Sequence, residues 1–173
     1  MPGYKGHIIG ATVCNATYVG ALAAAPANLL NNTHNLVSNP QLLAGLFVIA
    51  LLFGLFPDID TNSKGQNIFY GLALFADIWL ILDGRMVAAA FLGLLAMAPI
   101  VGKHRGWTHS KLAMVLIPSP IVLIPYVYNP AILDTALLIY GAAVTGYFSH
   151  LLFDGKIWKK FRIKGSRREY SAG

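Results

Sequence analysis

The amino-acid sequence predicts an all-α fold, a polytopic membrane bundle of about six apolar helices, and two observations carry this prediction. Of the 173 residues, 56% are hydrophobic and only 12% are charged, with a mean hydropathy of +0.59, whereas an ordinary soluble domain carries about 25% charged residues. The apolar residues fall into runs of roughly 15 to 24, the length that a bilayer core of about 30 Å requires of a helix. We therefore expect one membrane domain, residues 1–155, followed by a basic tail, residues 156–173.

The first three predicted helices lie in the N-terminal half. His7–Leu30 is rich in Gly and Ala, which permit close helix packing; alternatively, Ala21–Ala27 resembles the cleavage region of a signal peptide, and cleavage there would remove His7. The second predicted helix is Pro40–Phe56 and the third is Ile68–Leu82.

The last three predicted helices differ in regularity. Met86–Val101, like the third helix, is short for a spanning segment, so both either tilt little or sit partly inside the bundle. Ile132–Phe153 is long enough to cross and leads into the basic tail. The fifth helix, Lys111–Tyr128, should be kinked or broken, because each proline removes a backbone donor and disfavours helical geometry before it. Its prolines are Pro118, Pro120 and Pro125.

Polar clusters recur at the ends of these helices. If all six helices cross, their ends alternate between the two sides of the membrane, and four clusters fall on one side. These are His7, Asp58 with Asp60, His104 with His109, and His150 with Asp154. His34 lies in the linker on the opposite side.

The basic residues orient this topology. Lys5, Lys64, Lys103, Arg105, Lys111 and the tail fall on the side of the clusters, against Arg85 alone on the other. The positive-inside rule then makes that side, and the C-terminus, cytoplasmic.

The residue types of the clusters are those of a metal site. Imidazole nitrogens and carboxylate oxygens are natural ligands of zinc, and mixed His/Asp sets also bind manganese or iron. Cys14 is the single cysteine, which excludes a thiolate-rich zinc site and an intramolecular disulfide. Four-residue spacing places His150 and Asp154 on one helix face. We therefore expect a metal site at the cytoplasmic rim of the bundle.

The loop clusters need turns to bring their ligands together. Asp58 and Asp60 flank a turn after Pro57, and Gly106 supplies a flexible backbone between His104 and His109. Thr108 or Ser110 can cap the helix that follows.

Each cluster also has a purely structural interpretation. A single His at a helix end is often an interfacial hydrogen-bonding residue, PDID can be an acidic turn, and His150 and Asp154 can satisfy each other. Asp77 lies inside the third helix, where a carboxylate needs a partner; it either supports the metal ligands from outside or is a structural hydrogen-bonding residue.

The strings PDID (57–60), HRGWTHS (104–110) and H-x-x-x-D (150–154), with a His near the N-terminus, resemble the YdjM-type family of bacterial and archaeal inner-membrane proteins, described as metal-dependent hydrolases. The resemblance spans His7 to Asp154. That family is distantly similar to zinc-dependent phospholipase C and single-strand zinc nucleases, helical enzymes that bind a cluster of metal ions and hydrolyse phosphate esters.

The resemblance implies a set of site residues. The implied catalytic residues are Asp58 and Asp60, which can orient water, and Arg105, which can hold a phosphate oxygen. The implied ligands of one to three ions, zinc first among the candidates, are His7, Asp58, Asp60, His104, His109, His150 and Asp154.

The sequence thus predicts a membrane-embedded metal-dependent hydrolase of a phosphoester, such as a phospholipid or a lipid-linked phosphate. The alternative is a non-enzymatic adaptor that binds a partner or anionic lipid through its basic tail, Lys156 to Arg168, although the same tail can be a plain positive-inside anchor. We find no strong nucleic-acid signal. A metal transporter is disfavoured, because the predicted ligands gather at one rim and only Asp77 lies deep.

Overall fold

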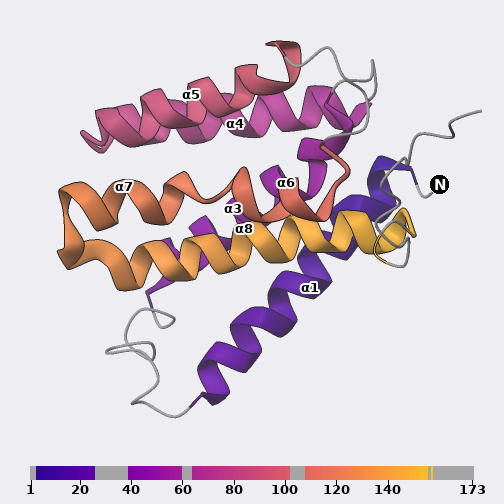
Figure 1. Ribbon diagram of the computed structural model, residues 1–173, viewed down its shortest axis with the longest axis horizontal. Coiled ribbons are helices and arrows are strands. Elements are labelled where there is room, and N and C mark those ends of the chain that lie inside the picture. The colour runs from indigo at the N-terminus through magenta and orange to yellow at the C-terminus, as the bar shows by residue number, and fades with distance from the viewer. Residues whose placement is uncertain (1–2, 26–38, 60–63, 102–107, 156, 158–173) are drawn as a thin grey trace, which may run out of the picture.

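A computed structural model describes residues 3–25, 39–59, 64–101, 108–155 and 157. All regular elements in these ranges are helical, which confirms the all-α prediction (Figure 1). In chain order they are α1 (Tyr4–Ala24), α3 (Pro40–Leu55), the 3-10 helix η1 (Phe56–Asp58), α4 (Lys64–Leu82), α5 (Met86–Val101), α6 (Lys111–Leu116), α7 (Pro120–Tyr128), the 3-10 helix η2 (Pro130–Ile132) and α8 (Leu133–Phe153).

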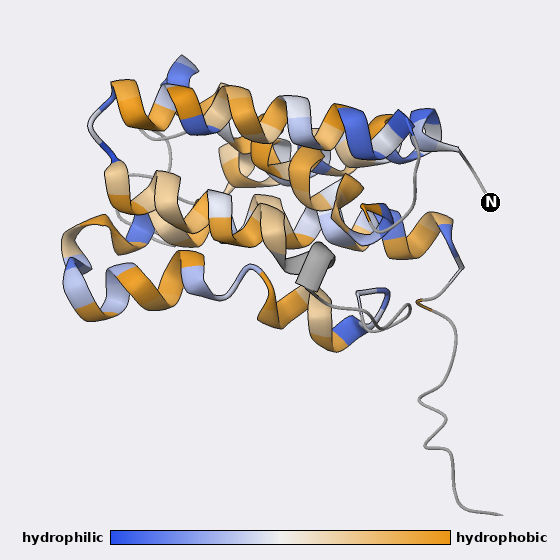
Figure 2. Ribbon diagram, turned by 90° about the horizontal axis from the view of Figure 1, so that it is seen from above, coloured by the Kyte–Doolittle hydropathy of each residue, from blue (hydrophilic) through white to orange (hydrophobic). Residues whose placement is uncertain are grey.

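Most of these helices have the dimensions of membrane-spanning segments. Hydrophobic residues, drawn in orange, make up most of their length (Figure 2). Five stretches are long and apolar enough to cross a membrane, namely Tyr4–Ala24, Pro40–Asp58, Lys64–Leu82, Lys111–Tyr128 and Pro130–Phe153. The shorter apolar helix, Met86–Met97, belongs to α5. The third predicted helix is therefore longer than expected from its sequence, and only the fourth remains short.

The proline-rich segment is broken, as predicted. Helix α6 ends at Leu116, and α7 begins at Pro120, where the missing N–H of proline has no cost because a first-turn donor has no helical partner. Between them the Ser119 hydroxyl donates to the Leu116 carbonyl at 2.7 Å, which satisfies a freed acceptor. Pro125 lies inside α7.

Helices α3 and α8 form the centre of the bundle. Helix α1 packs against both, α4 lies against α3 and pairs with α5, and α7 folds back along α8 (Figure 1). Buried aromatic rings fill the end of the bundle at which α3 and α8 both terminate. Phe56 contacts Phe53, Phe69 and Tyr147, with ring centroids 6.1 to 6.2 Å apart.

Two glycines allow α3 to approach its neighbours α8 and α1 closely. A Cβ atom at Gly146 of α8 would collide with the backbone of Ala50 in α3, and one at Gly54 of α3 would lie 2.8 Å from the Cβ of Ala11 in α1. Small residues at such crossings let helix backbones meet, which is how helices associate in an apolar solvent. The crossing of α3 and α8 therefore depends on glycine at position 146, and the crossing of α1 and α3 on glycine at position 54.

Gly146→Ala should separate α3 from α8, because the added methyl group meets backbone, which cannot rotate away. We expect a loss of about 1–3 kcal/mol in the free energy of unfolding, typical of overpacking, measurable as a lower melting temperature of the detergent-purified protein. Gly45→Ala, also in α3, is the matched control, because no atom lies within 4 Å of its added Cβ. Equal melting temperatures for both variants would contradict the proposed role of the crossing.

Candidate metal centre

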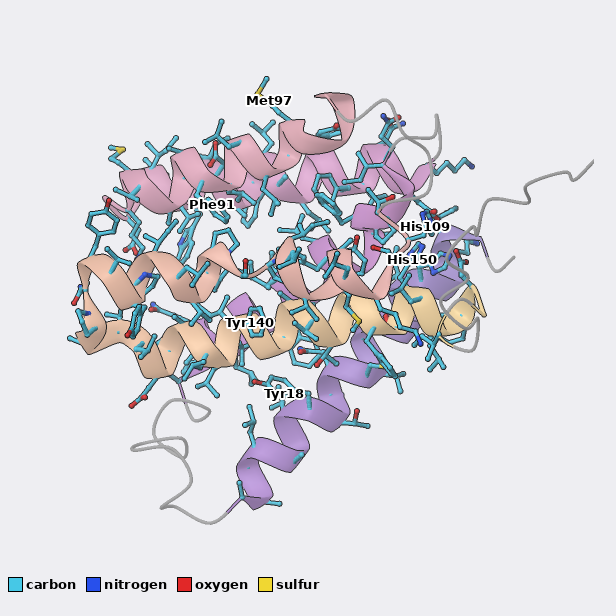
Figure 3. All side chains as sticks on the ribbon, viewed as in Figure 1. Tyr18, Phe91, Met97, His109, Tyr140 and His150 are labelled. Atoms are coloured by element: carbon cyan, nitrogen blue, oxygen red, sulfur yellow. The ribbon has the colours of Figure 1, made fainter. Side chains whose placement is uncertain are left out.

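Five of the predicted ligand residues lie together where α3 and α8 end. They are His7 in α1, Asp58 in η1, His109 before α6, His150 in α8, and Asp154 at the C-terminal end of α8. In Figure 3, His109 and His150 lie beside each other at this end of the bundle. Residues up to 147 positions apart in the chain thus share one site.

Four of these residues have the spacing of ligands around one ion. Ligand atoms of Asp58, His109, His150 and Asp154 all lie within 4.8 Å of one another. Oδ1 of Asp58 is 3.2 Å from Nε2 of His109 and 3.5 Å from Nε2 of His150. Oδ2 of Asp154 is 3.5 Å and 3.6 Å from the same two nitrogens. Ligands bound tetrahedrally about 2.1 Å from an ion are about 3.4 Å apart, so the distances fit.

His150 is held in the orientation that a metal ligand requires. Its Nδ1 lies 2.8 Å from the carbonyl oxygen of Gly54, so Nδ1 carries the proton and donates it. The side chain is fully buried, and its Nε2 has no hydrogen-bond partner among the described residues. A backbone carbonyl that fixes the tautomer of a His is a regular feature of metal sites. The Nε2 lone pair is therefore left facing the two carboxylates.

His109 is held by the residue before it in the loop. The Thr108 hydroxyl donates to the Pro57 carbonyl at 3.5 Å, and its Oγ1 lies 3.3 Å from Nδ1 of His109. The Tyr147 hydroxyl donates to the Thr108 carbonyl from α8. Ser110, and not Thr108, caps α6, since its Oγ accepts from the Ala113 N–H at 3.0 Å.

The two carboxylates differ in exposure. The Asp58 side chain is 38% exposed and the Asp154 side chain 4%. Asp58 lies in the tight 3-10 turn that follows α3, where Pro57 has no N–H to continue the α-helical pattern. Gly155, with φ +65°, ends α8 immediately after Asp154. Because of this difference in exposure, water reaches the cluster most easily from the side of Asp58.

The local electrostatics favour a cation. Oxygens of Asp58 and Asp154 lie within 4.8 Å of each other, and adjacent carboxylates repel unless a positive charge separates them. The C-terminal ends of α3 and α8 both lie here, and a helix C-terminus carries partial negative charge. The donor set suits zinc, with manganese or iron as alternatives. These residues therefore fit a divalent ion, although their role as ligands stays a prediction.

Several predicted site residues lie outside the described residues. They are Asp60, His104 and Arg105, together with His34, Lys103, Lys156 and residues 158–173 of the basic tail. Their predicted roles as ligands, anion contact or docking segment stay predictions.

Asp77 is remote from the cluster. Helix α4 begins beside η1, and Asp77 is 13 residues after Lys64, which corresponds to about 20 Å along a helix. Its partly buried side chain has an oxygen, Oδ1, without a hydrogen-bond partner among the described residues. This distance excludes one of the two interpretations of Asp77, namely that it supports the predicted metal ligands from outside.

Three groups that position the ligands were not identified from the sequence. They are the Gly54 carbonyl, the Thr108 carbonyl and the Tyr147 hydroxyl. Tyr147 precedes His150 by three residues and so shares its helix face, a signal that could have drawn attention to it. A backbone carbonyl has no signature in sequence.

The helices and this cluster define a polytopic helical membrane protein with a potential metal-binding group at one end of its bundle. Residues 5–157 match the family model described as YdjM inner membrane protein. The chain belongs to this family. Comparison with curated proteins gives no match, and comparison with solved structures gives none either.

Tyr147→Phe should weaken metal binding, because it removes the hydroxyl that holds the loop of His109. We expect a loss of about 1 kcal/mol in stability and roughly 10-fold weaker zinc binding, as for other supporting contacts of metal ligands. Zinc titration against a competing chelator measures the affinity. Tyr140→Phe is the matched control, because Tyr140 makes a similar bond, to the Val115 carbonyl at 3.3 Å, in the same helix. Equal zinc affinities for the two variants would refute this role of Tyr147.

Proposed function

We propose that the protein is a membrane-embedded metal-dependent hydrolase of phosphoesters, with a phospholipid or a lipid-linked phosphate as substrate. The observation that carries this proposal is the set Asp58, His109, His150 and Asp154, whose ligand atoms lie within 4.8 Å of one another at the end of an apolar bundle. Hydrolytic metal sites are built from such mixed nitrogen and oxygen ligands.

Different residues of the chain would have different roles around the metal. A divalent ion, when bound, polarises a phosphoryl oxygen and lowers the pKa of water toward neutrality. Asp58, the most exposed member of the cluster, is placed to accept a hydrogen bond from an incoming water and to orient it. Asp60 is proposed to assist it, and Arg105 to hold a phosphate oxygen through its planar donors.

The surroundings favour an anionic lipid over a soluble phosphoester. Lys5, Lys64 and Lys111 are exposed on the helices that begin beside the cluster, and their charges attract an anionic head group. The apolar outer faces of the same helices would lie among acyl chains. A substrate with both a phosphate and a lipid tail would match both features.

We further propose that the cluster faces the cytoplasm. The three lysines named above lie at its end of the bundle. At the opposite end of α4, Arg85 pairs with Asp83 at 2.5 Å, so that end carries less net positive charge within the described residues. The positive-inside rule favours the cytoplasm for the lysine-rich end.

The wild-type protein should release phosphorylated head groups, or phosphate, from anionic phospholipid vesicles. A soluble aryl phosphate should be hydrolysed much more slowly. Removal of metal by a chelator should abolish the activity, and added zinc should restore it. His109→Ala should lower both bound zinc and activity, the latter roughly 100-fold or more, because supporting contacts alone are worth 10–100-fold.

His109 suits this experiment because its side chain is partly exposed, at 14%, so its removal leaves the core intact. His34→Ala controls for the loss of a histidine that is not among the predicted ligands. If His109→Ala keeps its zinc, the metal site is wrongly assigned. If zinc is lost but no phosphoester is hydrolysed by the wild type, the metal site stands and the hydrolase proposal fails.

The orientation can be tested by cysteine labelling, since Cys14 is the single cysteine. In a Cys14→Ser background, Arg85→Cys should react with a membrane-impermeant maleimide added to intact spheroplasts, and Lys64→Cys should react only after permeabilisation. Both positions are exposed, so accessibility within the fold does not limit labelling. The opposite labelling pattern would place the cluster on the outer side.

A further inference from the structure

Asp77 is the one acidic side chain that lies well inside a membrane-spanning helix within the described part of the chain. It is 13 residues from Lys64, where α4 begins, and six residues before Asp83, which follows the end of α4. At about 1.5 Å per residue, its backbone lies roughly 9 Å inside that end of the helix. A carboxylate at this depth is costly in a bilayer unless a cation or a hydrogen-bond donor meets it.

The described residues supply no partner of opposite charge for Asp77. Its Oδ1 is buried and has no hydrogen-bond partner among them. Arg85, the basic residue nearest to it in the chain, is paired with Asp83. The described lysines lie at the opposite end of the bundle, beside the cluster, and are Lys5, Lys64 and Lys111. A charge that compensates Asp77 therefore has to come from outside these residues.

Helix α4 presents an apolar surface beside Asp77, which we call the outer face of α4. It consists of Gly71, Leu74, Ile78 and Ile81, and their spacing of three, four and three residues is the one at which two helices pack together. The three large side chains are between 44% and 62% exposed. Helices α4 and α5 lie along one side of the bundle and α1 along the other, so this face can be reached from the bilayer (Figure 1).

Asp77 lies at the edge of the outer face of α4. It follows the buried Ala73 by one helical turn and directly precedes the exposed Ile78, and its own side chain is partly exposed. Charged residues beside an apolar seam pair with the neighbouring helix and select it. In a bilayer, apolar contacts alone hardly distinguish a helix from lipid tails, so a polar pair is what gives such a face a specific partner.

We propose that the outer face of α4 binds a transmembrane helix of another protein, and that this helix carries a lysine or arginine at the depth of Asp77. The basic side chain pairs with Asp77, and the apolar side chains around it pack along the outer face. At Gly71 no atom lies within 4 Å of an added Cβ, so the backbone of a second helix has room to approach there. A second copy of this chain does not fit, because it would bring two carboxylates together, and adjacent carboxylates repel.

The test uses the full chain in phosphatidylcholine vesicles and a synthetic transmembrane helix of about 20 leucine and alanine residues, with one lysine roughly 9 Å from its end. Energy transfer between dyes on the peptide and on the protein measures the affinity. We expect Asp77→Asn to bind the peptide about 10-fold more weakly than the wild type, because it removes one member of a charge pair.

Asp134→Asn is the matched control. It removes a carboxylate from the first turn of α8, at the same end of the bundle, and should bind the peptide as the wild type does. Equal affinities of Asp77→Asn and Asp134→Asn would overturn the proposal. Asp77→Glu keeps the charge and should bind nearly as tightly as the wild type, which distinguishes loss of the charge from misfolding at this position.

A peptide with glutamine in place of the lysine separates charge pairing from apolar packing. It should bind the wild type and Asp77→Asn equally, and more weakly than the lysine peptide binds the wild type. If the wild type binds both peptides with the same affinity, the pairing with Asp77 is refuted.

An engineered cysteine reports whether a second copy covers the outer face of α4. In a Cys14→Ser background, Ile78→Cys should stay monomeric under mild oxidation in vesicles. Efficient formation of disulfide-linked dimers would assign this face to a second copy of the chain and overturn the proposal. These measurements require neither bound metal nor hydrolysis, so their outcome is independent of the proposed function.

Discussion

The close parallel crossing of α3 and α8 is the constraint on which the rest of the structure depends. Gly146 lets the two backbones meet at Ala50, and one turn further along each helix the same proximity lets Nδ1 of His150 reach the Gly54 carbonyl. In an apolar solvent this bond satisfies an acceptor near a helix end and also fixes the His tautomer. The same close crossing thus permits both the packing of small residues and the orientation of His150, and a wider crossing would lose both.

The short segments that carry Asp58 and His109 are held in place by contacts to the helices. Thr108 contributes its hydroxyl to Pro57 and its carbonyl to Tyr147, so one residue joins the loop after α3, the loop before α6 and the face of α8. Because Tyr147 belongs to the buried aromatic cluster with Phe56, the position of His109 is coupled to the core. The short segments that carry Asp58 and His109 therefore have the rigidity of the bundle, which a site of closely spaced ligands requires.

The helices could be predicted well from the sequence because the thickness of a bilayer sets the length of the apolar runs. The break in the fifth predicted helix could be predicted because the effect of proline on the backbone is local. The sequence also placed His7, Asp58, His109, His150 and Asp154 on one side, because membrane topology has only two sides. It could not show which carboxylate oxygen faces which histidine, since that depends on side-chain rotation at a helix crossing. The sequence also did not show how far Asp77 lies from the cluster, because the charge of a residue does not indicate its distance from residues on other helices.

The residues of the cluster come from the two ends of the described chain, and this would have a consequence for biogenesis if they bind the proposed cation. His7 lies in α1, the first helix described, whereas His150 and Asp154 lie at the end of α8, the last helix described. A nascent chain that has inserted α1 through α7 has only part of the cluster, so it cannot retain an ion as the complete protein would. Capture of the proposed cation would then follow insertion of α8. A loaded cluster would mark a chain whose membrane insertion is finished, and quality control that senses the ion would thereby sense completion of the fold.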